Sequence, residues 1–435
     1  MNPTPASPTP VRDDLERRLA AIGEEAGRHV FTRVAARAAR AEADAADARR
    51  RAGLSLGPLD GAIVSIKDLF DVAGEPTTAG SAIRRASPPA AADAPVVARL
   101  RRAGAVIVGK TNMTEFAFSG LGLNPHYGTP GNAADPARLP GGSSSGAGVS
   151  AALGTSDVAI GTDTGGSVRI PASLNGVVGF KPTARRVPLA GAFPLSPSLD
   201  SIGPLARSVA ACAAADAVMA GEEPAPLRPP ALADLRIGVP RGLLFTDTDP
   251  GVAADVEAAL GRLAAAGARI ADMTIDDLLE RFALATAAAP IASVEAYEVH
   301  ADWLDREGAG MDPRVRVRIE RGRPVGAAAY LRMMRARAEL IRACDARLLP
   351  FDAVALPTTA IPAPTIASVA EDDEAFSRTN VLMLRNTMVG NLFDLTALSL
   401  PLPGRALPAG LMLLARHGHD RRLLEIGAAI EACLG

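Results

Sequence analysis

The stretch from residue 139 to residue 183 constrains this chain most, because it holds two serine-bearing, glycine-rich turns separated by a short apolar strand. It reads LPGGSSSGAGVSAALGTSDVAIGTDTGGSVRIPASLNGVVGFKPT, and the turns are centred on Ser143 and Ser167. Glycine loses more conformational freedom on folding than any other residue, so this density is expected where backbone approaches backbone or a ligand closely. The stretch predicts a site built from main-chain N–H groups and hydroxyls.

Apolar strand-like segments alternate with amphipathic helical segments along most of the chain. This alternation predicts the α/β class, in an α/β/α arrangement with a central mixed, largely parallel sheet covered by helices. The segment 182–204 is expected to be mostly loop, and a helix is expected to open within 110–116. Strands are expected at 62–66, 105–109, 158–161, 236–239, 352–356, 397–400 and 410–414, and helices at 93–103, 148–153, 206–220, 252–266 and 421–433.

The domain organisation follows from composition along the chain. Residues 1–10 are rich in proline, threonine and serine, and we expect them to be disordered. Residues 11–52 predict a helical arm, and residues from about 55–220 and 235–435 predict the main α/β core. The proline-rich segment 221–234 fits a connector between two domains or a surface loop of one.

Charge and cysteine content exclude several classes of function. The net charge of −2 gives no field that would recruit nucleic acid or a membrane surface, so neither partner is expected. No apolar run approaches the roughly 20 residues that span a bilayer, and the N-terminus shows no secretory signal. Three scattered cysteines without a C-x-x-C pair predict no disulfide framework, no metal site and a cytoplasmic protein.

Lysine is rare in this chain. Of 46 basic residues only Lys67, Lys110 and Lys181 are lysine, and the rest are arginine. Arginine stays protonated in proteins, whereas lysine can lose its proton when it is desolvated. Lys67 follows the apolar segment 62–66, where poor solvation would lower its pKa and favour the neutral amine. The alternative is a lysine that reaches solvent or pairs with Asp68.

Two other chemistries fit the sequence less well. A serine hydrolase with a histidine base needs a G-x-S-x-G turn between a strand and a helix. The motif occurs at 53–57 and 142–146, but a proline-rich loop precedes the second, and only His300, His417 and His419 follow both. No phosphate-binding G-x-x-x-x-G-K-[ST] motif occurs. A non-catalytic binding protein stays open, because glycine turns can be purely structural.

A third chemistry uses the serines and the lysine together. A serine hydroxyl needs a base, and a neutral lysine can serve where histidine is missing. The run from Thr164 to Ser167 would direct successive N–H groups towards one point and so form an oxyanion hole.

The ordered set of motifs resembles the amidase signature family over nearly the whole chain from about residue 55. The motifs are SIKDL, GKTNMTEF, PGGSSSG, GTDTGGSVRIPA and GVVGFKPT, followed by SLDSIGPLARSV, DAVALPTT, LTALSLP and LPAGLMLL. The resemblance implies that residues 11–435 form one amidase signature domain. It also implies hydrolysis of a C–N bond in a small-molecule amide, carbamate, ureide or ester, with no cofactor.

The resemblance also assigns roles to individual residues. It implies Ser167 as the nucleophile, Ser143 as a bridging hydroxyl in a cis peptide, and Lys67 as the base. The family commonly has glycine in place of Ser145, and a serine there would be strained if the position needed φ > 0. The oxyanion hole is expected to use the N–H groups of Thr164, Gly165, Gly166 and Ser167, and Asp163 and Arg169 are expected to orient the turn.

Substrate choice is less constrained. The segment 311–322, MDPRVRVRIERG, resembles stand-alone amidases and carboxybiuret-type hydrolases more than the glutaminase (A-type) subunit of an amidotransferase. The glutaminase role and a non-catalytic relative are kept as alternatives, and a homodimer stays open. The apolar residues near 113–121 favour an uncharged acyl or aryl group. The predicted substrate contacts are Met113, Ala117, Phe118, Tyr127 and Arg169.

Overall fold

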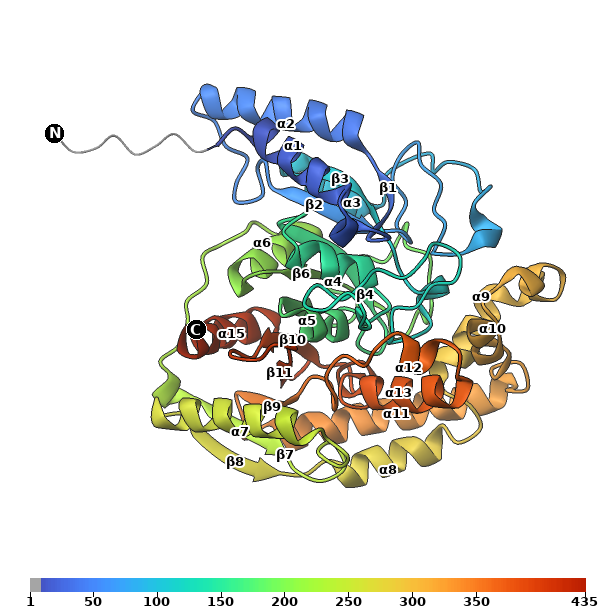
Figure 1. Cartoon of the computed structure of the whole chain (residues 1–435). Coiled ribbons are helices and arrows are strands. Elements are labelled where there is room, and N and C mark those ends of the chain that lie inside the picture. Colours follow the sequence, from blue (N-terminus) through green and yellow to red (C-terminus); the bar gives the residue numbers. More distant parts are fainter. Residues whose placement is uncertain (1–8) are drawn as a thin grey trace.

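A single eleven-stranded sheet runs through the molecule, from β1 near the top of Figure 1 to β8 at its lower edge. The computed structural model describes residues 9–435, so most of the predicted disordered segment 1–10 lies outside the described residues. The strand order is β1-β3-β2-β4-β6-β5-β10-β11-β9-β7-β8. The strands are β1 (Phe31–Val34), β2 (Ile63–Lys67), β3 (Val106–Thr111), β4 (Val158–Asp163), β5 (Val178–Lys181), β6 (Ser201–Ala206), β7 (Arg236–Pro240), β8 (Arg269–Met273), β9 (Ala353–Pro357), β10 (Thr396–Pro401) and β11 (Gly410–Ala415).

The predicted α/β fold with a mixed sheet is confirmed, but the expectation that the sheet is largely parallel is wrong. Six of the ten strand pairs are antiparallel. Strand β6 accounts for part of the error, because its Gly203 and Pro204 favour a loop by local pattern. Burial of all six of its residues and antiparallel pairing with both β4 and β5 nevertheless make it a central strand.

Helices cover both faces of the sheet, and side chains alternate between those faces along each strand. Val64 and Ile107 pack on the face covered by α3, α6, α7 and α15, whereas Ile63 and Val106 pack against α1 and α2. Farther along the second face lie α4 and α5, and then α8 and α11. The helices are α1 (Val11–Ile22), α2 (Ala36–Arg51), α3 (Pro95–Arg102), α4 (Ser145–Ala152), α5 (Arg169–Asn175), α6 (Val209–Ala220), α7 (Pro250–Ala265), α8 (Asp276–Ala285), α9 (Ile291–Glu307), α10 (Pro313–Glu320), α11 (Ala327–Leu348), α12 (Ala367–Ala370), α13 (Asp373–Arg385), α14 (Met388–Leu392) and α15 (Asp420–Leu434).

The segment after β3 is not the helix that the sequence predicts. Strand β3 continues to Thr111, and the Asn112 N–H donates to the Val30 carbonyl, which keeps the chain extended. Only a single 3₁₀ turn follows at Glu115–Ala117, where Phe116 and Ala117 adopt positive φ angles of 48° and 60°. Positive φ angles are incompatible with a continuing α-helix, so the predicted helix does not form here. The residues that follow lead towards the site described below.

The predicted N-terminal helical arm consists of α1 and α2 joined through the edge strand β1, which pairs antiparallel with β3. The Asp47 carboxylate on α2 accepts hydrogen bonds from the Val11 and Arg12 N–H groups, which satisfies donors at the start of α1. Among residues 9–435, no helix is both long and apolar enough to cross a bilayer.

Candidate active site

Lys67 is the last residue of β2, between β3 and β4, and its side chain is fully buried. Its Nζ donates to Ser143 Oγ at 2.8 Å and to Thr162 Oγ1 at 2.9 Å. Burial lowers the pKa of Lys67 to about 7, although the negative charges of Asp200 and Asp163 oppose the shift. A substantial fraction of this amine is therefore neutral near pH 7 and able to accept a proton.

The two other lysines show that burial is common to all three. It is Lys110, and not Lys67, whose Nζ pairs with Asp68 Oδ1, at 2.8 Å, so the alternative of a solvated or Asp68-paired Lys67 is wrong. Lys181 is also buried, and its pKa falls to about 8 through burial and the neighbouring charge of Arg169. At each of these three buried positions an arginine would be bulkier than the lysine and would stay protonated.

Ser143 lies in the loop that leads into α4, and its side chain is fully buried. The Gly142–Ser143 peptide bond is cis, as the family resemblance implies. The loop is fixed against the second turn, because the Ser144 N–H donates to the Ser167 carbonyl at 3.3 Å. Ser145 has no positive φ and is the first residue of α4, so the serine at this position is not strained.

Ser167 lies in the turn between β4 and α5, which Asp163 holds from its position at the end of β4. The Asp163 carboxylate accepts hydrogen bonds from the Gly166 N–H at 2.8 Å and the Val168 N–H at 3.1 Å. Gly166 has a φ of +136°, and a Cβ there would lie 2.1 Å from Thr387 Oγ1. The turn therefore requires glycine at this position for both backbone conformation and space.

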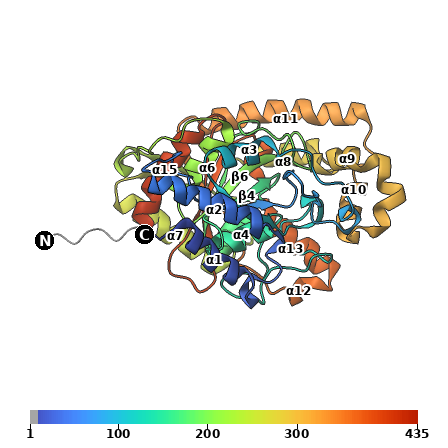
Figure 2. The same cartoon turned by 90° about the horizontal axis from the view of Figure 1, so that it is seen from above.

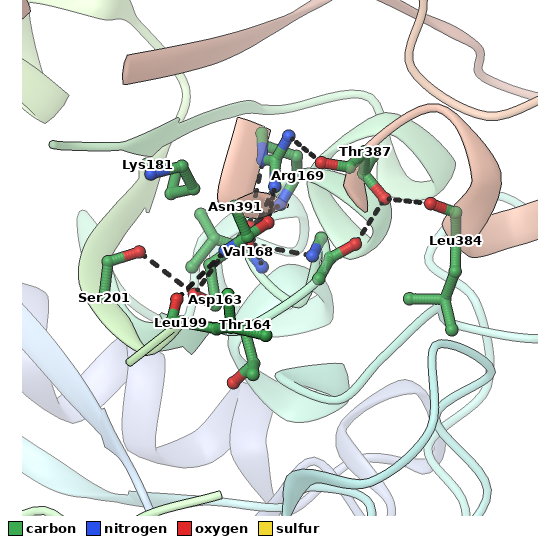
Figure 3. Close-up of polar contacts among 12 residues, drawn as sticks. Asp163, Thr164, Val168, Arg169, Lys181, Leu199, Ser201, Leu384, Thr387 and Asn391 are labelled. Atoms are coloured by element: carbon green, nitrogen blue, oxygen red, sulfur yellow. Dashed lines mark hydrogen bonds and ion pairs between the residues drawn. The ribbon is translucent and has the colours of Figure 1, made fainter. Parts of the chain in front are cut away.

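Arg169 holds the Asp163 carboxylate that supports the turn, and Figure 3 shows the two side chains together with Asn391. The Arg169 Nε and Nη2 donate to both Asp163 oxygens at 3.0 and 2.8 Å, and both side chains are fully buried. Asn391 on α14 joins the pair by accepting from Arg169 and donating to Asp163. Burial raises the pKa of Asp163, but the charge and hydrogen bonds of Arg169 outweigh it and bring the pKa to about 2. The carboxylate that holds the turn is thus ionised.

One of the four N–H groups predicted to form the oxyanion hole, that of Gly166, already has an acceptor within the protein. The Gly166 N–H is already engaged by Asp163, so the N–H groups of Thr164, Gly165 and Ser167 are the remaining predicted donors. The Thr164 hydroxyl donates to Asp200 Oδ1 at 2.5 Å, which anchors the start of the loop. Burial raises the pKa of Asp200 to about 6, with the hydrogen bond from Thr164 opposing the shift. At pH 7 most Asp200 is ionised.

A cavity of about 400 Å³ opens onto Ser167. Thr164 and Gly165 line it on the side of the sheet, and helices α8, α9, α10, α13 and α14 surround it. Of these helices, α9 and α10 lie on the right-hand side of the molecule in both Figure 1 and Figure 2. Most of the remaining lining is apolar and consists of Leu195, Leu199, Leu279, Phe282, Ala283, Pro290, Ile291, Ala292, Val381, Leu384, Met388 and Leu392.

The predicted substrate contacts divide into two groups. Ala117 and Phe118 line the cavity. Met113 is buried elsewhere in the core, and Arg85 stacks on the Tyr127 ring at 4.8 Å, outside the cavity lining. Arg169 is occupied by Asp163 behind the turn, which fits the orienting role and gives a substrate contact no support. The structure thus brings Lys67 and Ser143 into contact and separates three of the five predicted substrate residues from the cavity.

Several residues of the site were not predicted from the sequence. Thr162, which contacts Lys67, is part of the GTDTGGS motif, and Asp200, which accepts from Thr164, is part of the SLDSIGP motif. The motifs include these two residues but do not predict their contacts. Asn391, Asn380 and Arg318 come from helices far along the chain and carry no local signal.

Comparisons with known proteins identify the family of the chain. The family model described as amidase matches residues 16–424. The chain is 41% identical to 2-amino-5-chloromuconic acid deaminase of Comamonas testosteroni, over 91% of this chain and 87% of that protein. It is 36% identical to the A-type subunit of the glutamyl-tRNA(Gln) amidotransferase of Chloroflexus aurantiacus, over 91% and 87% of the two chains.

A solved structure shows the same fold. A crystal structure of an amidase superposes with a TM-score of 0.86 at 34% identity, and the alignment covers 98% of this chain and 96% of that one. The family model, the relatives and this structure agree over nearly the whole length of the chain. The chain therefore belongs to the amidase family of hydrolases that act on C–N bonds.

Proposed function

We propose that this amidohydrolase cleaves the C–N bond of small-molecule amides with Ser167 as nucleophile, Ser143 as relay and Lys67 as base. The observation that carries the proposal is the contact of 2.8 Å between Lys67 Nζ and Ser143 Oγ in a fully buried setting. The pKa of about 7 makes Lys67 a base suited to neutral pH.

In the first half of the reaction, Ser167 Oγ attacks the carbonyl carbon of the amide. Its proton passes to Ser143 Oγ, while the Ser143 proton passes to the lone pair of neutral Lys67. The tetrahedral oxyanion accepts hydrogen bonds from the free N–H groups of the Thr164–Ser167 turn. The C–N bond then breaks, and the relay returns the proton to the departing nitrogen, which leaves an acyl ester on Ser167.

In the second half, water attacks the acyl ester and gives its proton to Lys67 through Ser143. The bond between the carbonyl carbon and Ser167 Oγ breaks, Ser167 regains a proton through the same relay, and the carboxylic acid leaves. Because the relay acts on the leaving group only as a proton donor, carbamates, ureides and esters are included in the proposed range. The apolar lining of the cavity favours a hydrocarbon chain or ring beside the scissile carbonyl.

Active-site labelling tests the nucleophile. A fluorophosphonate probe should label the wild-type protein at one serine, and Ser167→Ala should abolish both labelling and turnover of small anilides. Lys67→Ala and Ser143→Ala should slow both by at least about 100-fold, in line with loss of general base catalysis. Ser145→Ala is the matched control and should label at the wild-type rate. Full labelling of Ser167→Ala would contradict the assignment.

A glutaminase role is the second candidate, and the similarity to the amidotransferase protein favours it. In that case the chain would release ammonia from glutamine faster than from simple amides. Ammonia release from glutamine, asparagine and propionamide, compared at equal concentrations, separates the two roles. A kcat/KM for glutamine well above that for the other amides would overturn the stand-alone amidase.

A homodimer and a cytoplasmic location belong to the same proposal. The mass of the purified protein by light scattering tests the dimer, because a monomer mass at all concentrations would contradict it. Turnover of anilides by the purified chain alone tests whether a second type of chain is required.

A further inference from the structure

Two arginines supply the formal charge of the cavity that holds Ser167. Arg318 lies in α10, and Arg321 follows the end of that helix. Of the described residues, no aspartate or glutamate lines this cavity, so its formal charge is positive. An enclosed space with charge of one sign attracts ligands of the opposite sign.

Neither arginine is paired with an acid. Within residues 9–435, no carboxylate lies at ion-pairing distance from Arg318 or Arg321. Arg318 donates one hydrogen bond, to the Arg314 carbonyl at 3.2 Å, and stacks on the Phe376 ring at 4.8 Å.

Other arginines of the same segment are paired. Arg314 pairs with Asp373 at 2.6 Å, and Arg316 pairs with Glu320 at 2.9 Å. Arg323 pairs with Asp305. The unpaired arginines of the segment are thus the two that line the cavity of Ser167.

The unpaired guanidinium of Arg318 is partly desolvated, which is costly, and an anion beside it would be stabilising. Burial and the positive charge of Arg321 lower the pKa of Arg318 to about 10. Arg318 is still protonated at neutral pH, so the site keeps its charge there.

Asn380 adds a neutral donor to the same cavity. Its Oδ1 accepts from the Gly120 N–H at 2.9 Å and from Ser119 Oγ at 3.1 Å. A backbone N–H can only donate, so this bond fixes the orientation of the amide. The Asn380 Nδ2 then has no acceptor in the part of the chain that the structure describes.

Arg318 and Arg321 also line a second hollow, of about 570 Å³, beside α12 and α13. They therefore lie where the two cavities adjoin. Of the acids of the second hollow, Asp373 pairs with Arg314, whereas Asp312 accepts from the Arg314 N–H and its negative charge also acts on Arg318. An anion that enters from this hollow meets the guanidinium groups of Arg318 and Arg321, neither of which has a carboxylate at ion-pairing distance among residues 9–435, before it reaches Ser167.

We propose that the enzyme selects amides that carry a carboxylate, which Arg318 and Arg321 bind while the scissile carbonyl lies at Ser167. This inference rests on the proposed function and names its substrate class. The proposed substrate carries a negative charge at one end, whereas the apolar residues near 113–121 predict an uncharged acyl or aryl group. The hydrocarbon part of such a substrate would occupy the apolar lining between the two ends.

Paired substrates test the proposal. The monoanilides of succinic, glutaric and adipic acid are compared with anilides of neutral unbranched acids of equal chain length. Two charge-assisted hydrogen bonds should raise kcat/KM for at least one acid by about 10- to 100-fold over its neutral partner. In Arg318→Gln/Arg321→Gln this ratio should fall to about one, mainly through KM. Arg316→Gln, paired with Glu320 and outside both cavities, should keep the wild-type ratio.

A charge reversal guards against a variant that fails to fold. Arg321 is exposed, so Arg321→Glu should fold, and it should lower the acid-to-neutral ratio below that of the wild type. Turnover with equal rates for acid and neutral anilides at every length, or a ratio unchanged in both variants, would overturn the inference. Absence of fluorophosphonate labelling at Ser167 in the wild type would instead overturn the proposed function, so the two failures are distinguishable.

Discussion

Asp163 and Arg169 form a fully buried, two-bond ion pair, and the same carboxylate holds the backbone of the turn that carries Ser167. The pair therefore connects the turn of Ser167 to α14 through Asn391. Arg169 is only two residues from Ser167, yet its side chain is buried against Asp163 and does not line the cavity. Loss of this contact is therefore expected to affect both the stability of the fold and the position of Ser167.

Removal of Arg169 should destabilise the protein strongly. Arg169→Met leaves the buried Asp163 carboxylate without its ion-pair partner, which costs about 3–5 kcal/mol in the free energy of unfolding. Urea unfolding measures this change. The control is Arg241→Met, which breaks the surface pair with Glu257 and should cost less than about 1 kcal/mol. Equal effects of the two substitutions would contradict the role given to the buried pair.

Activity should rise with pH through about 7. Lys67 acts as a base only when neutral, and the neutral amine predominates above its pKa of about 7. The pH profile of kcat/KM for a neutral anilide should therefore show an ascending limb near pH 7 and a plateau above it. Lys67→Arg should be inactive across the range, because a guanidinium stays protonated. A flat profile from pH 5 to 9 would exclude Lys67 as the base.

Asp200 is a positioning residue whose charge also acts on Lys67. The negative charge of Asp200 raises the pKa of Lys67, so its neutralisation in Asp200→Asn should move the ascending limb to lower pH. Asparagine can still accept the hydrogen bond from Thr164. The pH of the limb is the readout, since a purely structural change would lower the rate without moving the limb. An unmoved limb in a folded variant would refute this coupling.

Alanine substitutions at adjacent glycines should differ sharply. Gly166→Ala forces alanine to a φ of +136° and places its Cβ 2.1 Å from Thr387 Oγ1, so we expect a loss of at least about 2 kcal/mol. At Gly165 the nearest atom to an added Cβ is Met388 Cγ at 3.3 Å, on a flexible side chain. Thermal unfolding of the two variants should thus show a large shift only for Gly166→Ala.

Local sequence determined the pieces of the site. Glycine density marked the turns of Ser143 and Ser167, and the apolar segment before Lys67 predicted a buried strand end. These signals are local because backbone conformation and burial of a strand depend on neighbouring residues. The roles of the three residues in catalysis stay predictions until the variants are measured.

Tertiary structure decided what each piece touches. Strand β6 could not be predicted from local sequence, because Gly203 and Pro204 favour a loop. Its pairing with β4 and β5 places these residues in the sheet. Only the folded chain shows that Asp163 occupies the Gly166 N–H and that Arg169 is buried behind the turn. Arg318 reaches the cavity from a helix about 150 residues beyond Ser167. Contacts between segments so far apart depend on strand order and helix packing, which local patterns do not encode.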